Sequence, residues 1–481
     1  MLKLQNYING KLVAPQNKEY LNNYNPATGA VFSLIPKSNK KDLEKAVEAA
    51  EDAFLSWKNT PQEERSNILL HIADLIEKDL HSLASAESFD NGKTVSLATA
   101  MDIPRAAQNF RFYATAALHN HTNTYQTSEN VLNYTLREPL GVVGCISPWN
   151  LPLYLFTWKI APALASGNCV IAKPSEITPY TAFLLSKICI KAGLPAGVLN
   201  IIHGLGSEIG AEIVAHPQIK AISFTGGTLT GANIARIAAP MFKKLSLELG
   251  GKNPTIIFAD ADYQKAVAGA VRAAFTNQGQ ICLCGSRIFI EKSIYEKFKK
   301  DFVEEVKKLI PANPTDKNTN FGAVVSKEHL EKIISYVEIA KSEGGKILCG
   351  GAQTHPKGFE NGYFFQPTVI EGLAYDCRTN QEEIFGAIAT IQPFETEEEV
   401  LKYANSVRYG LSASLWTENN SRVQRMSKGL ASGIVWVNCW LIRDLRTPFG
   451  GVKDSGMGRE GGFEALNFFT EEKNVCIQNS E

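Results

Sequence analysis

Several features that would narrow the function are missing from this 481-residue sequence. Its 49 basic and 49 acidic side chains cancel, so it lacks the positive excess typical of proteins that bind nucleic acid or anionic membranes. It contains no uncharged apolar run of the ~18 residues that span a membrane, and its first residues do not form a signal peptide. We expect a cytoplasmic protein with small-molecule partners, and neither nucleic acid nor a membrane among them.

A disulfide framework is also missing, because the nine cysteines are odd in number and irregular in spacing. Cys282 and Cys284 stand one residue apart in the stretch NQGQICLCGSR. A structural zinc site needs four ligands and this pair of thiols supplies only two, so we expect no metal. From these residues alone the pair is either inert core or a nucleophile with a bystander.

The apolar pattern predicts an α/β fold. Helical periodicity over 38–57 and again after Pro61 indicates two amphipathic helices. Beyond Pro139, short apolar runs alternate with helix-length segments, which is typical of a parallel sheet built from βαβ units. The expected strands are 142–147, 168–174, 199–204 and 221–226, with a hairpin strand at 128–141, a second α/β region from 254 and a last strand at 467–477.

Two glycine patterns invite a nucleotide interpretation, but neither matches a standard motif. GLGSEIG (204–210) and GGTLTG (226–231) differ from the dinucleotide and P-loop spacings, and an ordinary strand-to-helix turn explains each taken alone. The second pattern follows the strand 221–226. A helix starting at Gly227 or Thr228 would therefore direct its N–H groups toward a pyrophosphate.

Two charged segments have both a structural and a functional interpretation. Lys173 and Glu176 follow a predicted strand, so they either form a solvated loop or hold ribose hydroxyls, and a carboxylate there favours a free 2′-OH over a 2′-phosphate. Glu248 stands between leucines before a Gly-Gly turn. It is either a capping or surface glutamate, or a general base whose pKa is raised by apolar surroundings.

Seven blocks together resemble the NAD(P)-dependent aldehyde dehydrogenase family over essentially the whole chain. They occur in the family's order: PWNLP (148–152), KPSE (173–176), FTGGT (224–228), LELGGKNP (247–254), GQIC (279–282), EEIFG (382–386) and PFGGVKDSGMGREGG (448–462). The sequence departs from many members at Gly227, where serine is common, and at Ala387, where proline is common.

The resemblance implies the aldehyde dehydrogenase fold, an α/β architecture with three parts. A Rossmann-like NAD-binding domain of parallel-sheet type would comprise 1–116 and 140–250, and an α/β catalytic domain would comprise 251–450. A small β extension for oligomerisation would comprise 117–139 and 466–481, in a homodimer or homotetramer.

The resemblance also implies roles for individual residues. Cys282 would be the nucleophile, Glu248 the base and Asn150 an oxyanion donor, with Lys159 and Glu460 relaying a proton. NAD is expected in preference to NADP. The residues implied in binding it are Ile146, Pro148, Trp149, Lys173, Glu176, Gly206, Phe224, Thr225, Gly226, Gly227, Thr228, Leu249, Glu383 and Phe385.

The substrate clue is a group of arginines. Arg443 lies in a loop that in this family borders the substrate tunnel, and Arg105 on a helix that lines its mouth. Arginine binds carboxylates in a bidentate way, so we expect both to contact a carboxylated aldehyde. Arg446 is expected instead to pair with Asp444 or Glu460.

These segments resemble the subgroup that oxidises 2-aminomuconate and 2-hydroxymuconate 6-semialdehydes in aromatic-ring and tryptophan catabolism. The alternatives are a betaine-aldehyde or broad aliphatic aldehyde dehydrogenase, a CoA-acylating relative, and a non-catalytic binding or structural protein on the same fold. Members that transfer to CoA typically lack the glutamate found here at 248.

Overall fold

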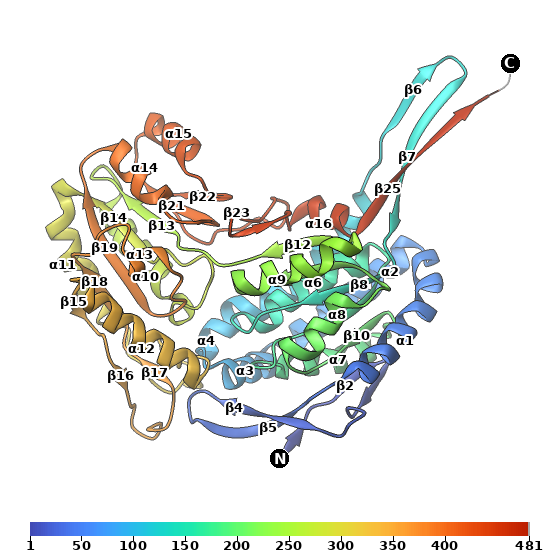
Figure 1. The fold of residues 1–481 in the computed structure, drawn as a ribbon, viewed down its shortest axis with the longest axis horizontal. Helices are drawn as coiled ribbons and strands as arrows, with labels where there is room; N and C mark the ends of the chain where they lie inside the picture. Colours follow the sequence, from blue (N-terminus) through green and yellow to red (C-terminus); the bar gives the residue numbers. More distant parts are fainter. Residues whose placement is uncertain (480–481) are drawn as a thin grey trace.

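The protein is described by a computed structural model over residues 1–479. Two large sheets form the centres of two lobes that lie side by side (Figure 1). The first sheet has eight strands in the order β24-β12-β11-β8-β9-β10-β2-β3. Their bounds are β2 (Asn6–Ile8), β3 (Lys11–Val13), β8 (Val142–Ile146), β9 (Cys169–Lys173), β10 (Leu199–Ile201), β11 (Ile219–Thr225), β12 (Lys244–Glu248) and β24 (Gly456–Met457).

The five central strands of this sheet are parallel, as the alternating pattern predicts. β8, β9, β10 and β11 fall within the four expected apolar runs or extend one by two residues. α6 (Pro152–Ala165) connects β8 to β9, and α7 (Tyr180–Ala192) connects β9 to β10. Every residue of α6 is buried, which explains why this helix carries apolar residues on all sides and why its one charged residue, Lys159, needs a buried partner.

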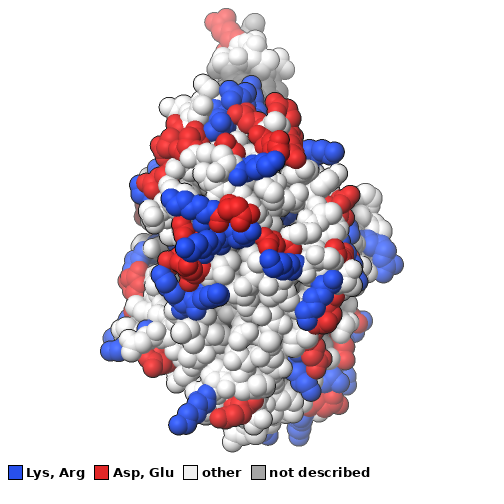
Figure 2. All heavy atoms as spheres, turned by 90° about the vertical axis from the view of Figure 1, so that its left-hand side faces the viewer, with Lys and Arg blue, Asp and Glu red and all other residues white. Residues whose placement is uncertain are grey.

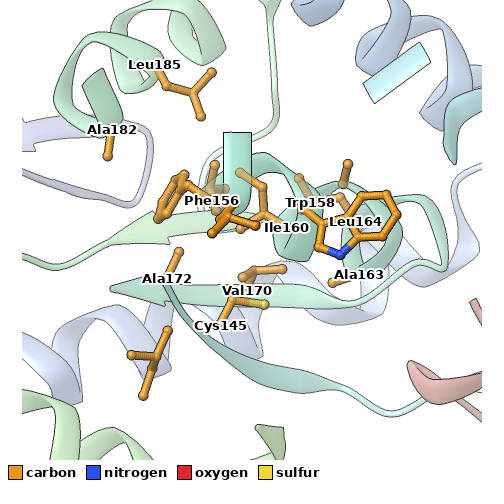
Figure 3. Close-up of a cluster of buried hydrophobic side chains, with 14 of the residues drawn as sticks. Cys145, Phe156, Trp158, Ile160, Ala163, Leu164, Val170, Ala172, Ala182 and Leu185 are labelled. Carbon is orange, nitrogen blue, oxygen red and sulfur yellow. The ribbon is translucent and has the colours of Figure 1, made fainter. Parts of the chain in front are cut away.

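The core of the first lobe lies between α6, α7 and this sheet. Figure 3 shows Phe156 and Ile160 of α6 facing Val170 of β9 and Cys145 of β8, with Leu185 of α7 above them. Burying side chains of this size contributes roughly 1.5–3 kcal/mol each. This packing fixes β8 and the helix that follows it, and the segment between them carries Asn150.

The first two helices of this lobe confirm the amphipathic pattern. α1 (Lys40–Asn59) begins with a capping box between Asn39 and Asp42, and α2 (Gln62–Lys78) follows Pro61. The remaining helices of this lobe are α3 (Leu80–Asn91), α4 (Val95–Leu97), the π-helix η1 (Ala98–Asp102), α5 (Ile103–Ala116), the π-helix η3 (Gly206–Gly210), α8 (Ala211–Ala215) and α9 (Thr228–Ala238).

The second sheet begins at residue 254, as expected, and has seven strands in the order β15-β18-β19-β14-β13-β21-β22. They are β13 (Pro254–Ile257), β14 (Arg287–Glu291), β15 (Lys346–Cys349), β18 (Thr368–Glu371), β19 (Ile388–Phe394), β21 (Ser412–Trp416) and β22 (Ile434–Val437). Its helices include α10 (Tyr263–Phe275), α11 (Tyr295–Val306), α12 (Lys327–Ser342), α14 (Glu397–Asn405) and α15 (Asn420–Gly429).

A three-stranded sheet projects from the first lobe (Figure 1). It contains the predicted hairpin strand, here β7 (Val131–Pro139), between β6 (Thr124–Ser128) and β25 (Thr470–Gln478). The expectation that the last strand starts at 467 is wrong, because α16 (Gly462–Phe468) continues through that position with Ala465 and Leu466 buried. Residues 480–481 of the expected oligomerisation element lie outside the described part of the chain.

Smaller elements complete the fold. A ribbon of β1 (Leu2–Lys3), β4 (Tyr20–Asn25) and β5 (Ala30–Pro36) runs along the base of the first lobe (Figure 1). Figure 2 shows basic and acidic side chains intermixed over the face of the second lobe, in keeping with the balanced charge. Within residues 1–479, no helix combines the length and apolarity needed to cross a membrane.

Candidate active site

The carboxyl ends of four parallel strands meet at one edge of the first sheet. Ile146 of β8 pairs with Lys173 of β9 on one side and with Phe224 of β11 on the other. On β12, Glu248 pairs with Thr225 of β11. Ligands of open α/β sheets bind outside these strand ends, so the register itself gathers the residues implied by the family resemblance.

A cavity of about 240 Å³ lies beside this edge, between the two lobes. Its wall contains ten of the residues expected at the site, together with Gly250, His329 and Lys332. The ten are Pro148, Trp149, Asn150, Thr225, Gly226, Gly227, Leu249, Cys282, Glu383 and Phe385. The expected thiol, the expected oxyanion donor and eight of the expected cofactor residues therefore share one cavity although they come from five separate motifs. The expected base Glu248 and the other cofactor residues, Ile146, Lys173, Glu176, Gly206, Phe224 and Thr228, do not line this cavity.

The segment before Cys282 has a strained backbone. Asn277, Gln278 and Gly279 have φ of 53°, 58° and 72°, in the left-handed region that side chains rarely adopt. A Cβ at Gly279 would lie 2.3 Å from the carbonyl oxygen of Gly386, so only glycine fits there. Such strain costs of order 1–3 kcal/mol per residue and persists where surrounding contacts hold the backbone in place.

Side-chain donors supply those contacts by binding the carbonyls of the loop. The Asn150 Nδ2 donates to the carbonyl oxygen of Gln280 at 2.9 Å. Asn253 Nδ2 donates to the carbonyl of Cys282 at 2.7 Å and to that of Cys284 at 3.0 Å. The Trp440 Nε1 donates to the carbonyl of Leu283 at 2.9 Å. The backbone that carries the Cys282 thiol is thereby fixed.

The two neighbouring cysteines differ in what they face. Cys282 is partly exposed in the wall of the cavity, whereas Cys284 is 6% exposed and packs in the hydrophobic core. Burial raises the pKa of the Cys282 thiol, and the carboxylates of Glu383 and Glu248 raise it further, while Arg443 opposes them. Two carboxyl groups and a cation therefore lie close enough to affect the pKa of this thiol.

Glu248 is a buried carboxyl group at the last position of β12. It is 4% exposed, and neither of its oxygens accepts a hydrogen bond from the residues that the structure describes. Burial raises its pKa well above the ordinary value, and the negative charge of Glu460 adds to this. A carboxylate with a raised pKa and free lone pairs can take a proton from water.

Glu460 and Lys159 form an ion pair beneath Glu248. Lys159 Nζ donates to Glu460 Oε1 at 2.7 Å, and both side chains are at most 8% exposed. The hydroxyls of Ser223 and Ser246 donate to the same oxygen at 3.0 and 3.3 Å. The expected relay residues thus belong to one hydrogen-bonded group that influences the pKa of Glu248.

A second charged group stands at the end of β9. Lys173 Nζ donates to Glu176 Oε2 at 2.9 Å, and the N–H of Gly206 donates to Glu176 Oε1 at 3.0 Å. Although burial opposes it, the pKa of Glu176 is lowered because Lys173 and this N–H stabilise the carboxylate. Glu176 is therefore ionised and can accept hydrogen bonds from hydroxyl groups.

The start of α9 suits a phosphate group. The helix begins at Thr228 with Gly227 as its N-cap, as expected, and its first N–H groups have no partners within the helix. A Cβ at Gly226 would lie 2.4 Å from the Phe224 ring, whereas a Cβ at Gly227 would meet no atom within 4 Å. Only the first of these glycines is required, so serine at the second position in relatives poses no conflict.

Glu383 and Phe385 enter the cavity from the second lobe. The N–H of Gly251 donates to Glu383 Oε1 at 2.8 Å. Phe385 has a φ of 62° and packs edge-on against Trp149, with ring centroids 5.2 Å apart, while His329 donates to its carbonyl at 2.7 Å. Together with the strand-end carboxylate and the N-terminus of α9, these residues fit a dinucleotide.

Arg105 and Arg443 approach the same tyrosine. Arg443 donates to the hydroxyl of Tyr154 at 2.8 Å, and Arg105 on α5 lies 5.7 Å from the centre of that ring. Both line a separate open pocket with a volume of about 510 Å³. Arg446 is exposed and bound to Asp444 at 2.6 Å, so the expectation of an ion pair with Asp444 is confirmed.

Sequence reasoning missed several residues that hold this site in place. The principal ones are Asn253, Asn277, Tyr154 and Trp440. Asn253 had a signal, since it lies within the LELGGKNP block, but its contact with the Cys282 carbonyl depends on tertiary structure. Within residues 1–479, no group of three potential metal-binding side chains occurs.

The protein belongs to the aldehyde dehydrogenase family, whose sequence pattern matches residues 12–475. It is therefore an oxidoreductase with the fold that its sequence blocks indicate. It is 50% identical to the 2-aminomuconic semialdehyde dehydrogenase of Homo sapiens over 483 aligned positions, which cover 100% of this chain and 99% of that protein. It is 43% identical to the 2-hydroxymuconic semialdehyde dehydrogenase of Pseudomonas sp. (strain CF600), covering 99% and 100% of the two chains.

Solved structures agree with this assignment. The NAD+ complex of an aldehyde dehydrogenase from Bacillus cereus has a TM-score of 0.97 and 38% identity. The alignment covers 99% of this chain and 97% of that one.

The two cysteines give the first prediction. Cys282→Ser replaces the exposed sulfur with a poor nucleophile and is expected to abolish aldehyde oxidation, whereas Cys284→Ala is expected to retain most of it. Cofactor reduction measured by absorbance distinguishes the variants. An active Cys282→Ser variant beside an inactive Cys284→Ala variant would reverse the assignment.

The second prediction concerns Asn150. One hydrogen of its amide is bound to Gln280, which leaves the other for an oxyanion in the cavity. Losing one such donor typically costs ~2.7–4 kcal/mol, so Asn150→Ala is expected to lower kcat by roughly two to three orders of magnitude. Circular dichroism and the thermal midpoint serve as folding controls. Near-normal turnover in a folded variant removes Asn150 from the mechanism.

Proposed function

We propose that this protein oxidises a carboxylated semialdehyde with NAD, and that its substrate is 2-aminomuconate or 2-hydroxymuconate 6-semialdehyde. The single observation that carries the proposal is the convergence of Arg105 and Arg443 on Tyr154. The printed names of the relatives from Homo sapiens and Pseudomonas support the same substrate class.

Arg443 is well prepared to bind a carboxylate. Its guanidinium lies 3.9 Å from the centre of the Phe449 ring and 4.9 Å from that of Trp158, and it donates one N–H to Tyr154. This packing orients the remaining N–H groups before the substrate arrives. Arg443 also lowers the pKa of both Cys282 and Glu248, so its charge lies near the reacting atoms.

In the reaction we propose, the Cys282 thiolate adds to the aldehyde carbon and forms a thiohemiacetal. Asn150 and the backbone N–H of Cys282 stabilise the oxyanion through hydrogen bonds. When bound, the dinucleotide supplies the acceptor for the hydride that leaves this carbon. Cys282 then holds the acyl group as a thioester.

Glu248 completes the reaction by hydrolysing that thioester. It removes a proton from a water molecule, which attacks the carbonyl carbon, so that the acid leaves and the thiol is restored. Lys159 and Glu460 form a hydrogen-bonded group with two serine hydroxyls, and their charges act on the pKa of Glu248, so we propose this group as the acceptor of the proton that leaves Glu248. A role as general base explains why neither carboxyl oxygen of Glu248 accepts a hydrogen bond from the described residues.

The preference for NAD over NADP follows from Glu176. Its carboxylate stands at the end of β9, is ionised, and accepts bonds from Lys173 and Gly206. Ribose hydroxyls are donors to such a group, whereas a 2′-phosphate would bring a second negative charge against it.

We also propose a cytoplasmic homodimer or homotetramer. All five residues of β6 are exposed, and β25 leaves one edge of the projecting sheet unpaired within the described chain. Exposed strands and edges of this kind are readily covered by another copy. All nine cysteines are free, which suits a reducing compartment.

The substrate assignment predicts a selective effect of arginine removal. Arg105→Ala and Arg443→Ala are each expected to raise the KM for 2-hydroxymuconate semialdehyde about tenfold or more, since a charge-assisted bond contributes ~1.5–3 kcal/mol. The KM for a neutral aliphatic aldehyde should change little. Steady-state kinetics with both substrates provide the measurement.

Arg446→Ala is the matched control, because Arg446 lies in the same loop and lines the same pocket, but its guanidinium is already paired with Asp444. It should leave both KM values unchanged. The wild-type protein should also prefer the semialdehyde to betaine aldehyde and to the aliphatic aldehyde. A preference for either of the latter, or equal effects of the arginine variants on both substrates, contradicts the proposal.

The base assignment predicts a pH dependence. Glu248 acts only when ionised, and its pKa is raised, so deacylation should fall as the pH decreases through that raised value. Glu248→Gln is expected to retain a stoichiometric burst of cofactor reduction, lose steady turnover and lose this pH dependence. Stopped-flow absorbance between pH 5 and 9 tests this. Steady turnover with an unchanged pH profile in the variant would exclude Glu248 as the base.

A further inference from the structure

A buried ionic cluster lies beneath the segment that carries Asn150. Lys93 bonds to the carboxylate of Asp102, and its Nζ lies 3.9 Å from Glu87 Oε1. All three side chains have no exposed surface. None of the sequence blocks that define the family site contains these residues, and none of them faces the cavity that holds Cys282.

The stretch that contains Glu87 and Lys93 holds the segment 149–153 at three points. Asn91 Nδ2 donates to the carbonyl of Trp149 at 2.9 Å. Lys93 Nζ donates to the carbonyl of Asn150 at 3.0 Å. The N–H of Leu153 donates to the Glu87 carboxyl at 3.4 Å. These three hydrogen bonds therefore fix the path of the backbone on either side of Asn150.

The carbonyl of Asn150 is also bound from the opposite side. Asn277, in the strained loop before Cys282, donates to it through Nδ2 at 2.9 Å. Lys93 and Asn277 thus share one acceptor, while the Asn150 side chain donates to Gln280. A carbonyl held by two donors fixes its peptide plane, and with it the direction of the side-chain amide that faces the cavity.

The cluster contains one ammonium group and two carboxyl groups. Burial raises the pKa of Glu87 to about 8 and also raises the pKa of Asp102, while the positive charge of Lys93 opposes both shifts. Replacing a buried ion pair with apolar side chains is often neutral or stabilising. Stability alone therefore gives little reason for this pair, whereas directional hydrogen bonding does.

Asp102 connects the cluster to the substrate side of the site. It is the last residue of the π-helix η1 and directly precedes α5, the helix that carries Arg105. π-helical turns are frequent at functional sites, where they shift the side chains that follow. Through Lys93, the start of α5 and the backbone of Asn150 are bound to a single ammonium group.

We propose that Lys93, held by Asp102, is a positioning residue for aldehyde oxidation that aims the Asn150 amide at the oxyanion. The inference rests on the role of Asn150 proposed above. Lys93 itself does not contact the substrate. It acts by keeping the Asn150 backbone in place while the charge on the oxyanion develops.

The test uses the full-length double variant Lys93→Met/Asp102→Asn, which removes both charges and so leaves neither ion buried without a partner. Its kcat should fall about 10- to 100-fold, because misplacing a catalytic group by ~1 Å can cost that much. The KM for a neutral aldehyde and the Kd for NAD should change less than about threefold, and iodoacetamide should label Cys282 at the wild-type rate.

A kinetic cycle separates positioning from a general structural effect. In an Asn150→Ala background the same double substitution should lower kcat by less than about twofold, since the group it positions is already absent. Losses that multiply in the two backgrounds overturn the inference, as does a folded double variant with kcat within about twofold of wild type. If Asn150→Ala alone leaves turnover intact, the proposed role of Asn150 fails first, and the inference fails with it.

Two further variants complete the experiment. Lys243→Met is the matched control, because Lys243 is also buried and donates to the carbonyls of Val214 and His216, far from the cavity. It should lower the thermal midpoint and leave kcat unchanged. If the double variant does not fold, Lys93→Met alone decides, because the two buried carboxyl groups that it leaves have raised pKa values and can be protonated. It should lower kcat at least about threefold, again only when Asn150 is present, and unchanged turnover overturns the inference.

Discussion

The register of the parallel strands in the first sheet is the constraint on which the rest of the site depends. Because β8, β9, β11 and β12 end together, a carboxylate, a helix N-terminus and the Asn150 segment reach the same edge without any long loop. A shift of one residue in β12 would turn Glu248 to the other face of the sheet. The chemistry is thus set by backbone pairing before any side-chain contact is considered.

Around this edge, the protein uses side-chain amides and one ammonium group to hold backbone carbonyls. Asn150, Asn253, Asn277 and Lys93 all bind carbonyl groups of the Asn150 or Cys282 segments. Loops cannot form the repeating hydrogen bonds of helices and strands, so their carbonyls need other donors. A strained loop with satisfied carbonyls is rigid, and a rigid loop can present a thiol and an oxyanion donor in fixed positions.

The sequence predicted the fold well where local patterns determine structure. Short apolar runs located four of the eight strands of the first sheet, β8 to β11, and an alternating pattern located the hairpin strand β7, because burial on both faces or one face leaves a clear period. The end of α16 was missed, since Phe468 and Phe469 fit a helix as readily as a strand and only packing decides between them.

For the candidate site, the sequence indicated some residues and missed others. Cys282, Glu248 and Asn150 stand in blocks with a recognisable order, and the structure brings them to one region. Tyr154 and Lys93 carry no such signal, because a tyrosine or lysine in an apolar segment has many structural explanations. Their contacts join residues 57 and 289 positions apart in the chain, and only the folded structure shows them.

The return of the chain to the first lobe has a consequence for biosynthesis. β24 and Glu460 lie beyond the last strand of the second sheet, yet they pair with β12 and with Lys159. A nascent chain that has emerged from the ribosome only as far as the end of the second sheet already contains Cys282 and Glu248, but it lacks β24 and Glu460, so the ion pair with Lys159 cannot yet form. Since domains fold in order of synthesis, the surroundings of Glu248 are completed only when this final segment docks. Translation therefore imposes a delay between the synthesis of Cys282 and the completion of the site around it.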